Sequence, residues 1–526
     1  MKNYFSLAFV ILFIILSFKT QSQTEKYRLS YRDDPATTVV IGWSGASASV
    51  CYDTIDHGIN WDQYSFQHGV DRTTNYMGMN NYFVRLTGLK PSKTYYFVVK
   101  SALVSERFYF KTLTDEWNNN DTICFVVGGD TRTGLPTEDD YQNCRLYRND
   151  GNRLVAAIRP DFVAFGGDFV YQLPGIYTNE QDYKDWLDDW QHSKTYDGQL
   201  FPLAISFGNH EIGKDVYNLF DVPNEDDYYA LNFGGNLFRL YCLSSEVNAC
   251  DYVPQRNWLD NDLLIHSFND YQPYWKIAQY HTPMHNNSST TTDASRQDMI
   301  DCWAPRFRTY KVNLALENHA HFVKYTWPIV PSTAAGSDQG FIRDDNEGTV
   351  YVGDGSWGAP MKNFNDGYSW NRDKARIHGF HLVRVSAKEI QVRTVDFSNA
   401  NEVYPLPPRS YCKPLPKNLK IWNPSNGSVV ILNKPNVISV EDNKPVEKEV
   451  NIYPNPTTGI IYIDFSGMQH DRKIQLYNSL GKLILEKTSD KNTGEESINM
   501  NNKSKGIYYV YIKADDHFEM HKISLQ

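Results

Sequence analysis

The chain has 526 residues, of which 41% are hydrophobic and 14% aromatic, and this composition supports roughly two to four packed domains and excludes a disordered protein. The formal net charge of -10, from 62 acidic and 52 basic side chains, offers no basic surface, so we expect no nucleic-acid partner. The seven cysteines lack the close Cys-x-x-Cys spacing of a zinc site.

Residues 1–22 have the pattern of a secretory signal peptide. Lys2 precedes an apolar run that extends to Phe18 and ends in small and polar residues. The run is short for a membrane span, so we expect export through the inner membrane and a soluble mature protein. Export permits disulfides, and Cys242 and Cys250, on either side of a short polar segment, are the expected pair.

Residues 24–115 are predicted to form a β-sandwich. Four segments rich in β-branched and aromatic residues, 38–43, 82–86, 94–99 and 106–110, are separated by Gly, Pro, Asn and Asp. The stretch 86–97 resembles the strand-turn-strand of fibronectin type III modules, which are sandwiches. We expect a structural or packing role for this domain, and a ligand-binding role is the alternative.

Residues 120–411 are predicted to form an α/β domain. Short apolar strands alternate there with amphipathic segments, a pattern typical of sheets covered by helices. Helices are predicted over 180–191, 254–265 and 294–310. The loops after the strands are polar, which is expected where a site is built along one edge of a sheet.

Five predicted strands of this domain end in side chains that can bind metal. The strands cover 122–127, 161–165, 202–207, 275–280 and 312–316, and the side chains that follow are Asp130, Asp168 with Tyr171, Asn209, His281, and His319 with His321. Each alone has an ordinary explanation, such as a tight turn or a surface histidine. Together they favour one shared metal site, because the carboxyl ends of such strands converge on a crevice. The set is too large for one tetrahedral zinc ion and suits two metal ions bridged by a carboxylate.

The order Gly-Asp, Gly-Asp-x-x-Tyr, Gly-Asn-His-Glu, His and His-x-His resembles the motifs of calcineurin-like metallophosphoesterases, and the tyrosine points to purple acid phosphatases. The resemblance covers residues 27–398 and implies layered β-sheets flanked by helices. It also implies a dinuclear metal centre. Asp130, Tyr171 and His321 would hold a ferric ion, Asn209, His281 and His319 a divalent ion of iron, zinc or manganese, and Asp168 would bridge the two.

Two positions depart from the family pattern. The family often has glycine shortly after the first aspartate, whereas Asp130 is followed by Thr131-Arg132-Thr133-Gly134, and Asn318 replaces the glycine that usually precedes His-x-His. Asparagine tolerates a left-handed backbone, so we expect the second turn to persist. The guanidinium of Arg132 either holds phosphate oxygens bidentately or forms a surface ion pair.

The resemblance implies an acid phosphatase that hydrolyses phosphate monoesters by attack of a metal-bound hydroxide. His210, next to Asn209, is expected to protonate the leaving group, with Glu211 orienting it. His285, four residues after His281, is either a second positive partner for the ester or an ordinary loop histidine. Two alternatives remain: a phosphodiesterase or nucleotide hydrolase on the same site, and a secreted binding or adhesion protein whose phosphoesterase domain is inactive.

The C-terminal part is predicted to be a linker followed by a second sandwich. Residues 412–448 are rich in Pro, Asn and Lys, which is typical of a spacer. Residues 449–526 are β-rich, and through 452–459, 474–482 and 505–511 they resemble the sorting domain of type IX secretion substrates. The resemblance implies contact with that secretion machinery and a location at the cell surface or outside the cell. An ordinary small β-sandwich is the alternative.

Overall fold

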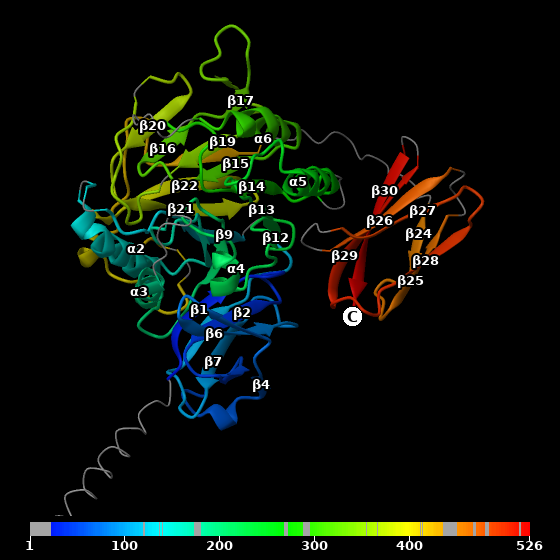
Figure 1. Ribbon diagram of the computed structural model, residues 1–526, viewed down its shortest axis with the longest axis horizontal. Coiled ribbons are helices and arrows are strands. Elements are labelled where there is room, and N and C mark those ends of the chain that lie inside the picture. The colour runs from blue at the N-terminus through cyan, green and yellow to red at the C-terminus, as the bar shows by residue number, and fades with distance from the viewer. Residues whose placement is uncertain are drawn as a thin grey trace, which may run out of the picture.

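The protein is described by a computed structural model in which three β-rich parts follow one another along the chain (Figure 1). The described residues are 23–118, 121–135, 137–138, 140–172, 180–267, 272–287, 295–353, 355–365, 367–410, 412, 414–434, 450–465, 470–478, 483–514 and 517–526. The predicted signal peptide and residues 413 and 435–448 of the predicted linker lie outside these residues, whereas residues 430–433, predicted as linker, form a strand of the central sheet. In the described part, each helix is too short or too polar to cross a membrane.

The N-terminal part is a sandwich of two antiparallel sheets, as predicted. One layer contains β1 (Glu25–Ser30), β2 (Val39–Ser44), β5 (Arg72–Tyr76) and β6 (Met79–Leu86). The other contains β3 (Ser49–Asp53), β4 (Phe66–His68), β7 (Thr94–Lys100) and β8 (Phe108–Lys111), and a short 3-10 helix covers Trp61–Gln63. Trp43, Phe97 and Phe108 are fully buried between the layers, which explains the aromatic segments of the sequence.

The first layer of this sandwich continues into the central domain. β1 pairs in parallel with β11 (Pro202–Ile205), with Leu29 opposite Pro202 and Ser30 opposite Leu203. The result is a single ten-stranded sheet in the order β23-β22-β21-β9-β10-β11-β1-β2-β6-β5. The sequence predicted two separate units and gave no sign of this shared sheet.

The central domain consists of two sheets packed face to face. The ten-stranded sheet contributes β9 (Thr122–Gly128), β10 (Phe162–Phe165), β11, β21 (Gly379–Ser386), β22 (Glu389–Asp396) and β23 (Val430–Asn433). The second sheet has the order β12 (Tyr229–Phe233), β13 (Phe238–Cys242), β14 (Trp275–Gln279), β15 (Leu314–Glu317), β19 (Val350–Gly353), β16 (Val323–Thr326) and β20 (Asn371–Ala375). A small hairpin joins β17 (Ile329–Pro331) to β18 (Phe341–Arg343). The core lies between the large sheets, where Phe162 stacks on Phe233 at 4.3 Å between ring centroids.

Helices cover the outer faces of both sheets (Figure 1). They are α2 (Cys144–Ile158), α3 (Glu180–Trp190), α4 (Asp215–Phe220), α5 (Val253–Ile265) and α6 (Gln297–Thr309), with 3-10 turns at Tyr141–Asn143, Gln191–Ser193 and Phe397–Glu402. Three of them, α3, α5 and α6, confirm predicted helices, whereas α2 and α4 were not predicted.

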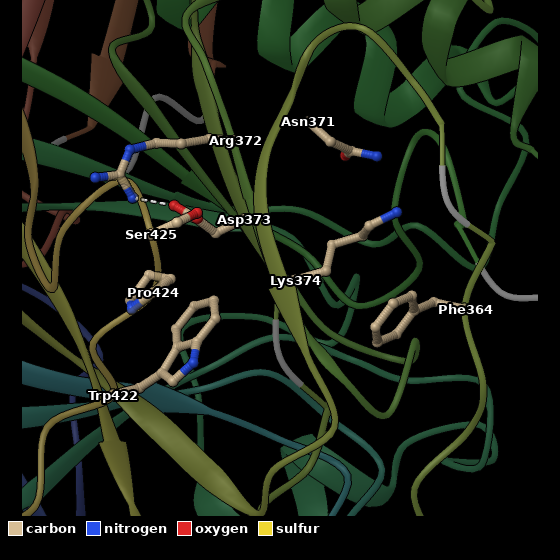
Figure 2. Close-up of a pocket in the computed structure, with 8 residues that line it drawn as sticks. All are labelled: Phe364, Asn371, Arg372, Asp373, Lys374, Trp422, Pro424 and Ser425. Atoms are coloured by element: carbon tan, nitrogen blue, oxygen red, sulfur yellow. Dashed lines mark hydrogen bonds and ion pairs between the residues drawn. The ribbon is translucent and has the colours of Figure 1, made fainter.

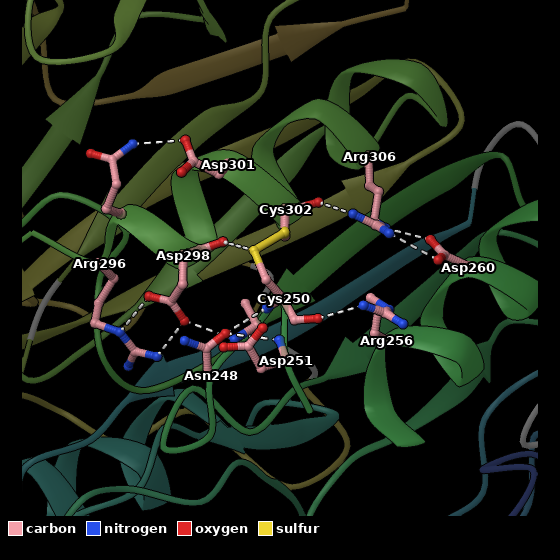
Figure 3. The surroundings of a disulfide bond; sticks show 12 residues. Asn248, Cys250, Asp251, Arg256, Asp260, Arg296, Asp298, Asp301, Cys302 and Arg306 are labelled. Atoms are coloured by element: carbon pink, nitrogen blue, oxygen red, sulfur yellow. Dashed lines mark hydrogen bonds and ion pairs between the residues drawn. A yellow bond between two sulfur atoms is a disulfide. The ribbon is translucent and has the colours of Figure 1, made fainter. Parts of the chain in front are cut away.

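Two disulfides connect distant parts of the central domain. They join Cys124 to Cys412 and Cys250 to Cys302. The predicted Cys242–Cys250 pair is therefore wrong: Cys242 is fully buried in the core at the end of β13, whereas Cys250 faces α6 (Figure 3).

The C-terminal part is a second sandwich, as predicted. One sheet contains β24 (Asn451–Tyr453), β25 (Ile460–Asp464) and β28 (Glu495–Asn499), and the other β26 (Arg472–Asn478), β27 (Leu483–Ser489), β29 (Gly506–Ala514) and β30 (His517–Leu525). Ile265, at the end of α5, packs against Tyr477, Tyr509 and Tyr511 of this domain. The C-terminal sandwich lies beside the central domain, next to α5 (Figure 1).

Candidate metal centre

The two candidate aspartates sit in tight turns at the ends of neighbouring strands. Asp130 follows β9 and Asp168 follows β10, with φ of 55° and 56°, a left-handed conformation that non-glycine residues seldom adopt. The amide of Asp130 donates to the carbonyl of Gly167 at 3.0 Å, so the two turns are bonded to each other. Such backbone strain is concentrated at functional sites, where the surrounding structure must hold it.

Glu211 holds the turns of two strands together. Its buried carboxylate accepts hydrogen bonds from the amides of Asp168 at 2.8 Å, Phe169 at 2.9 Å and Gly208 at 2.7 Å. The sequence predicted that Glu211 orients the imidazole of His210. In the structure its bonds go to backbone groups, so it fixes the loop that carries Asp168.

His210 is oriented by other groups. Its amide donates to Asp168 Oδ1 at 3.0 Å, and its ring Nδ1 donates to the carbonyl oxygen of Gln172 at 2.7 Å. The ring Nε2 then lies 3.8 Å from Asp168 Oδ2. Because a backbone carbonyl accepts the Nδ1 proton, Nε2 is the nitrogen left to exchange a proton with a ligand.

The remaining imidazoles come from the other sheet, after β14 and β15. His281 Nδ1 donates to the carbonyl of Gly166 at 2.8 Å, and its Nε2 lies 3.3 Å from Asp168 Oδ1 and 3.0 Å from Asn209 Oδ1. His319 Nδ1 lies 3.3 Å from His281 Nε2. The five strand ends therefore converge, as predicted, but they belong to two facing sheets and not to one.

The last imidazole completes the cluster on the side of the first aspartate. His321 Nε2 lies 3.1 Å from Asp130 Oδ1, while its Nδ1 donates to the carbonyl of Pro360 at 2.7 Å. His319 and His321 have φ of 63° and 54°. Asn318 does not have a positive φ, so the expected left-handed backbone at this position was wrong. A Cβ on Gly166 would lie 1.9 Å from the Asn318 side chain, so that side chain packs directly on the glycine.

The donor set fits metal ions. One ligand atom each from Asp168, His281 and His319 lies within 4.8 Å of the other two. Asp130 Oδ1 is buried and accepts no hydrogen bond, with His321 Nε2 at 3.1 Å as its neighbour, and a cation beside this oxygen would offset the cost of burying it. His281 and His321 each donate one ring proton to a backbone carbonyl, the arrangement that orients a metal-binding imidazole.

The charges of the cluster favour the same conclusion. Burial alone would raise the pKa of Asp168, but the imidazoles of His281 and His210 hold it well below its usual value. Burial alone would lower the pKa of His281, yet Asp168 and Asp130 raise it well above its usual value. Two buried carboxylates thus require positive charge beside them, a requirement that cations meet.

Arg132 and Tyr171 form a layer next to His210. The ring centroids of Tyr171 and His210 are 4.6 Å apart, and the Arg132 guanidinium carbon lies 5.1 Å from the Tyr171 centroid. Arg132 donates to both carboxylate oxygens of Glu138, at 3.1 and 2.8 Å, and its side chain is only 6% exposed. An ion pair therefore exists beside the site, between the buried Arg132 and the partly exposed Glu138. The sequence reading missed Glu138.

His285 lies in a different setting from the other candidates. Its ring packs at 4.7 Å from that of Tyr368 and 5.4 Å from that of Trp370. Burial and the nearby Lys324 ammonium lower its pKa, so the ring is held neutral. The role of His285 as a positively charged partner of the ester thus stays a prediction, and this environment does not favour it.

A pocket of about 400 Å³ opens beside β20 and is lined by Phe364, Asn371, Arg372, Asp373, Lys374, Trp422, Pro424 and Ser425 (Figure 2). Its basic groups are already engaged within the chain. Arg372 donates to Asp373 at 2.6 Å and to the carbonyls of Gly427 and Val429, and Lys374 donates to the carbonyl of Asn365. None of the candidate ligands lines this pocket, so we do not assign the phosphate to it.

Two family comparisons cover the ends of the chain. Residues 24–112 match the family described as Purple acid Phosphatase, N-terminal domain. Residues 451–526 match the family described as Secretion system C-terminal sorting domain.

Solved structures match the larger part of the chain. A purple acid phosphatase from yellow lupin (Lupinus luteus) seeds superposes with a TM-score of 0.56 at 16% identity, over 72% of this chain and 73% of that chain. The chain has the purple acid phosphatase fold. The structure of PhoD superposes on this chain with a TM-score of 0.51 at 13% identity, over 72% of this chain and 88% of that chain.

Curated relatives with the purple acid phosphatase name come from Arabidopsis thaliana. "Probable inactive purple acid phosphatase 1" is 21% identical over 303 residues, 51% of this chain and 44% of that protein. "Purple acid phosphatase 15" is 24% identical over 291 residues, 49% of this chain and 52% of that protein. The chain spans about half the length of these relatives. One of them is named inactive.

Proposed function

We propose that the protein is a secreted dimetal phosphoesterase that hydrolyses phosphate monoesters as purple acid phosphatases do. The observation that carries the proposal is the clustering of the donor atoms of Asp168, His281 and His319 within 4.8 Å, beside the buried Asp130 Oδ1, which lies 3.1 Å from His321 Nε2. Asp130, Tyr171 and His321 would hold a ferric ion, Asn209, His281 and His319 a divalent ion of iron, zinc or manganese, and Asp168 both.

When bound, the ions would polarise the phosphate and make a water molecule nucleophilic near neutral pH. The protein's own groups complete the chemistry. His210 Nε2 is the proton donor for the departing alkoxide, because its Nδ1 proton is committed to Gln172. Glu211 keeps Asp168 in place through three backbone hydrogen bonds. Arg132 lies over the Tyr171 ring and is paired with Glu138, so it would bind phosphate oxygens at the rim of the site in exchange for that pair.

The proposal is tested by metal analysis of purified protein together with hydrolysis of a phosphoester panel across pH. We expect about two metal ions per chain and a preference for p-nitrophenyl phosphate over bis-p-nitrophenyl phosphate. A preference for the diester would replace the monoesterase by a phosphodiesterase on the same site. Metal-loaded protein without activity on either ester would favour the inactive binding protein.

Tyr171 distinguishes a purple acid phosphatase from other dimetal phosphoesterases. A phenolate bound to ferric iron absorbs visible light, so oxidised iron-loaded protein should be violet or pink. We expect Tyr171→Phe to lose this band while retaining metal, since the charged ligands stay in place. Tyr196→Phe is the control, because that side chain is 71% exposed. An identical absorption band in Tyr171→Phe would show that Tyr171 does not bind the iron.

The C-terminal sandwich is expected to serve type IX secretion and not catalysis. It contains none of the candidate metal ligands and follows the predicted linker. Removal of residues 450–526 should leave kcat/KM within about twofold of wild type and retain the enzyme inside the outer membrane. The measurements are kinetics on purified truncated protein and fractionation of the producing cells. Normal export of the truncated chain would contradict the sorting role.

A further inference from the structure

A further strand end reaches the edge where the candidate imidazoles lie. β13 runs parallel to β14, with Cys242 opposite Gln279, and the amide of Leu243 donates to the carbonyl of Gln279 at 2.9 Å. The residues after β13, Ser244 to Glu246, therefore lie beside His281, which follows β14. The sequence places polar residues here as it does after the other strands, but serine and a single glutamate are weak signals.

The Glu246 carboxylate is anchored through one of its two oxygens. Oε1 accepts hydrogen bonds from the hydroxyl of Ser245 at 2.9 Å and from the hydroxyl of Thr282 at 2.8 Å. The amide of Thr282 donates to Ser245 Oγ at 2.8 Å, which ties the two loops together. Thr282 directly follows His281, so these bonds place Glu246 beside the candidate metal centre.

Arg296 and Asp298, drawn in Figure 3, hold the loop that carries Glu246. Arg296 donates to the carbonyls of Ser245 and Val247 and forms an ion pair with Asp298 at 2.9 Å. Asp298 in turn accepts the amide of Ala249 at 2.7 Å. The Cys250–Cys302 disulfide then attaches the loop to α6. A carboxylate on so constrained a loop loses little conformational entropy when a ligand binds it.

The second oxygen of Glu246 is available to a ligand. Within the described part of the chain, Glu246 takes part in no ion pair, and its Oε2 accepts no hydrogen bond. A negative charge beside a phosphate site repels further negative charge on the substrate and attracts a positive group. The unpaired carboxylate therefore suits a substrate with a cationic group next to its phosphate.

We propose that Glu246 determines substrate specificity by accepting a hydrogen bond from an ammonium group on the alcohol part of the ester. The substrate class is short amino-alcohol phosphates, of which 2-aminoethyl phosphate is the simplest. Polyanionic esters such as nucleoside triphosphates are disfavoured by the same charge. This inference rests on the proposed function, because it assumes that phosphate binds at the metal centre.

The test compares two phosphonates that cannot be hydrolysed as esters. Calorimetry on the full, metal-loaded chain would measure binding of 2-aminoethylphosphonate and of propylphosphonate, which has similar size without the ammonium. We expect wild type to bind the amino compound about tenfold or more tightly, the effect of one charge-assisted hydrogen bond. Glu246→Gln should bind both ligands equally. Asp251→Asn removes an equal charge from an exposed position further along the same loop and should keep the preference.

Two outcomes overturn the proposal. In the first, wild type shows no preference, or binds neither phosphonate. In the second, Glu246→Gln weakens both ligands by the same factor, so that Glu246 only joins Ser245 to Thr282. The glutamine can still accept from both hydroxyls, so the melting temperature should change by less than about 2 °C.

Hydrolysis separates this inference from the proposed function. Wild type should cleave 2-aminoethyl phosphate with a kcat/KM about tenfold above that for propyl phosphate, and Glu246→Gln should abolish the difference. If wild type binds the phosphonates with the expected preference but cleaves neither ester, the proposed function fails while the role of Glu246 stands.

Discussion

Asp168→Asn should lose both metal ions and nearly all activity. Asp168 is fully buried, lies 3.3 Å from His281 Nε2 through Oδ1 and 3.8 Å from His210 Nε2 through Oδ2, and is the group proposed to contact both ions. We expect turnover to fall about a thousandfold or more, because metal ions supply several kcal/mol of charge stabilisation to the transition state. Metal analysis and steady-state kinetics on the same preparation measure both effects.

The asparagine variant is preferable to alanine for this test. Its amide oxygen can still accept the hydrogen bond from the His210 amide, which is 3.0 Å from Oδ1 in the wild type, so the turn should remain folded. Asp185→Asn on α3 is the control, since it removes an equal charge from a residue that pairs with Arg145 away from the cluster. Two ions per chain in Asp168→Asn would show that this carboxylate is not shared between them.

His210→Ala should slow hydrolysis according to the leaving group. General acid catalysis contributes about 10²–10⁴-fold where the departing alkoxide needs a proton, and much less where the leaving group is a stable anion. We therefore expect a loss of that size for propyl phosphate and at most about a threefold loss for p-nitrophenyl phosphate. Metal content should be unchanged, because the proposed ligands remain.

The leaving-group comparison also shows how this expectation would be refuted. An equal loss for both esters would assign His210 to phosphate binding or to the support of Asp168. Unchanged rates for both would remove it from the mechanism. His192→Ala is a suitable control, since this histidine is exposed at the end of α3 and should leave both rates as they are.

The candidate ligands could be picked out from the sequence because they share one pattern, a short apolar strand followed by a polar side chain. Asp130, Asp168, Asn209 and His281 each follow a short apolar strand within a few residues, so parallel strand ends were enough to bring them together. The division between two sheets was not visible, because a buried strand has the same apolar composition in either sheet.

The partners of the cluster were not predictable in the same way. The carbonyls of Gln172, Gly166 and Pro360, which orient three imidazoles, are backbone groups that leave no mark on the sequence. Glu138 was missed because it lies outside any strand end, and its pairing with Arg132 depends on how the loop folds back. Glu211 bonds to the backbone amides of Asp168 and Gly208, and these bonds depend likewise on how closely two turns approach each other in the fold.

The missed helix α2 has a local physical explanation. Gly151 lies in its middle, where glycine lowers intrinsic helix stability by about 1 kcal/mol relative to alanine. The structure requires glycine at this position, because a Cβ there would lie 2.2 Å from the Trp357 indole nitrogen. Arg148 of the same helix is buried and pairs with Asp189 of α3. A charged residue normally indicates an exposed position, so this inward-facing arginine weakened the helical pattern of the sequence.

The pairing of β1 with β11 constrains how a newly exported chain can reach this structure. β1 is among the first residues of the described chain, and its parallel partner is supplied far later, after α2 and α3 have been delivered. Until then the N-terminal sandwich has an open strand edge, which is prone to pairing with other chains. A contact so distant in sequence also forms slowly. The first domain to emerge therefore keeps an open edge until part of the central domain has followed it, and in that interval it is exposed to pairing with other chains.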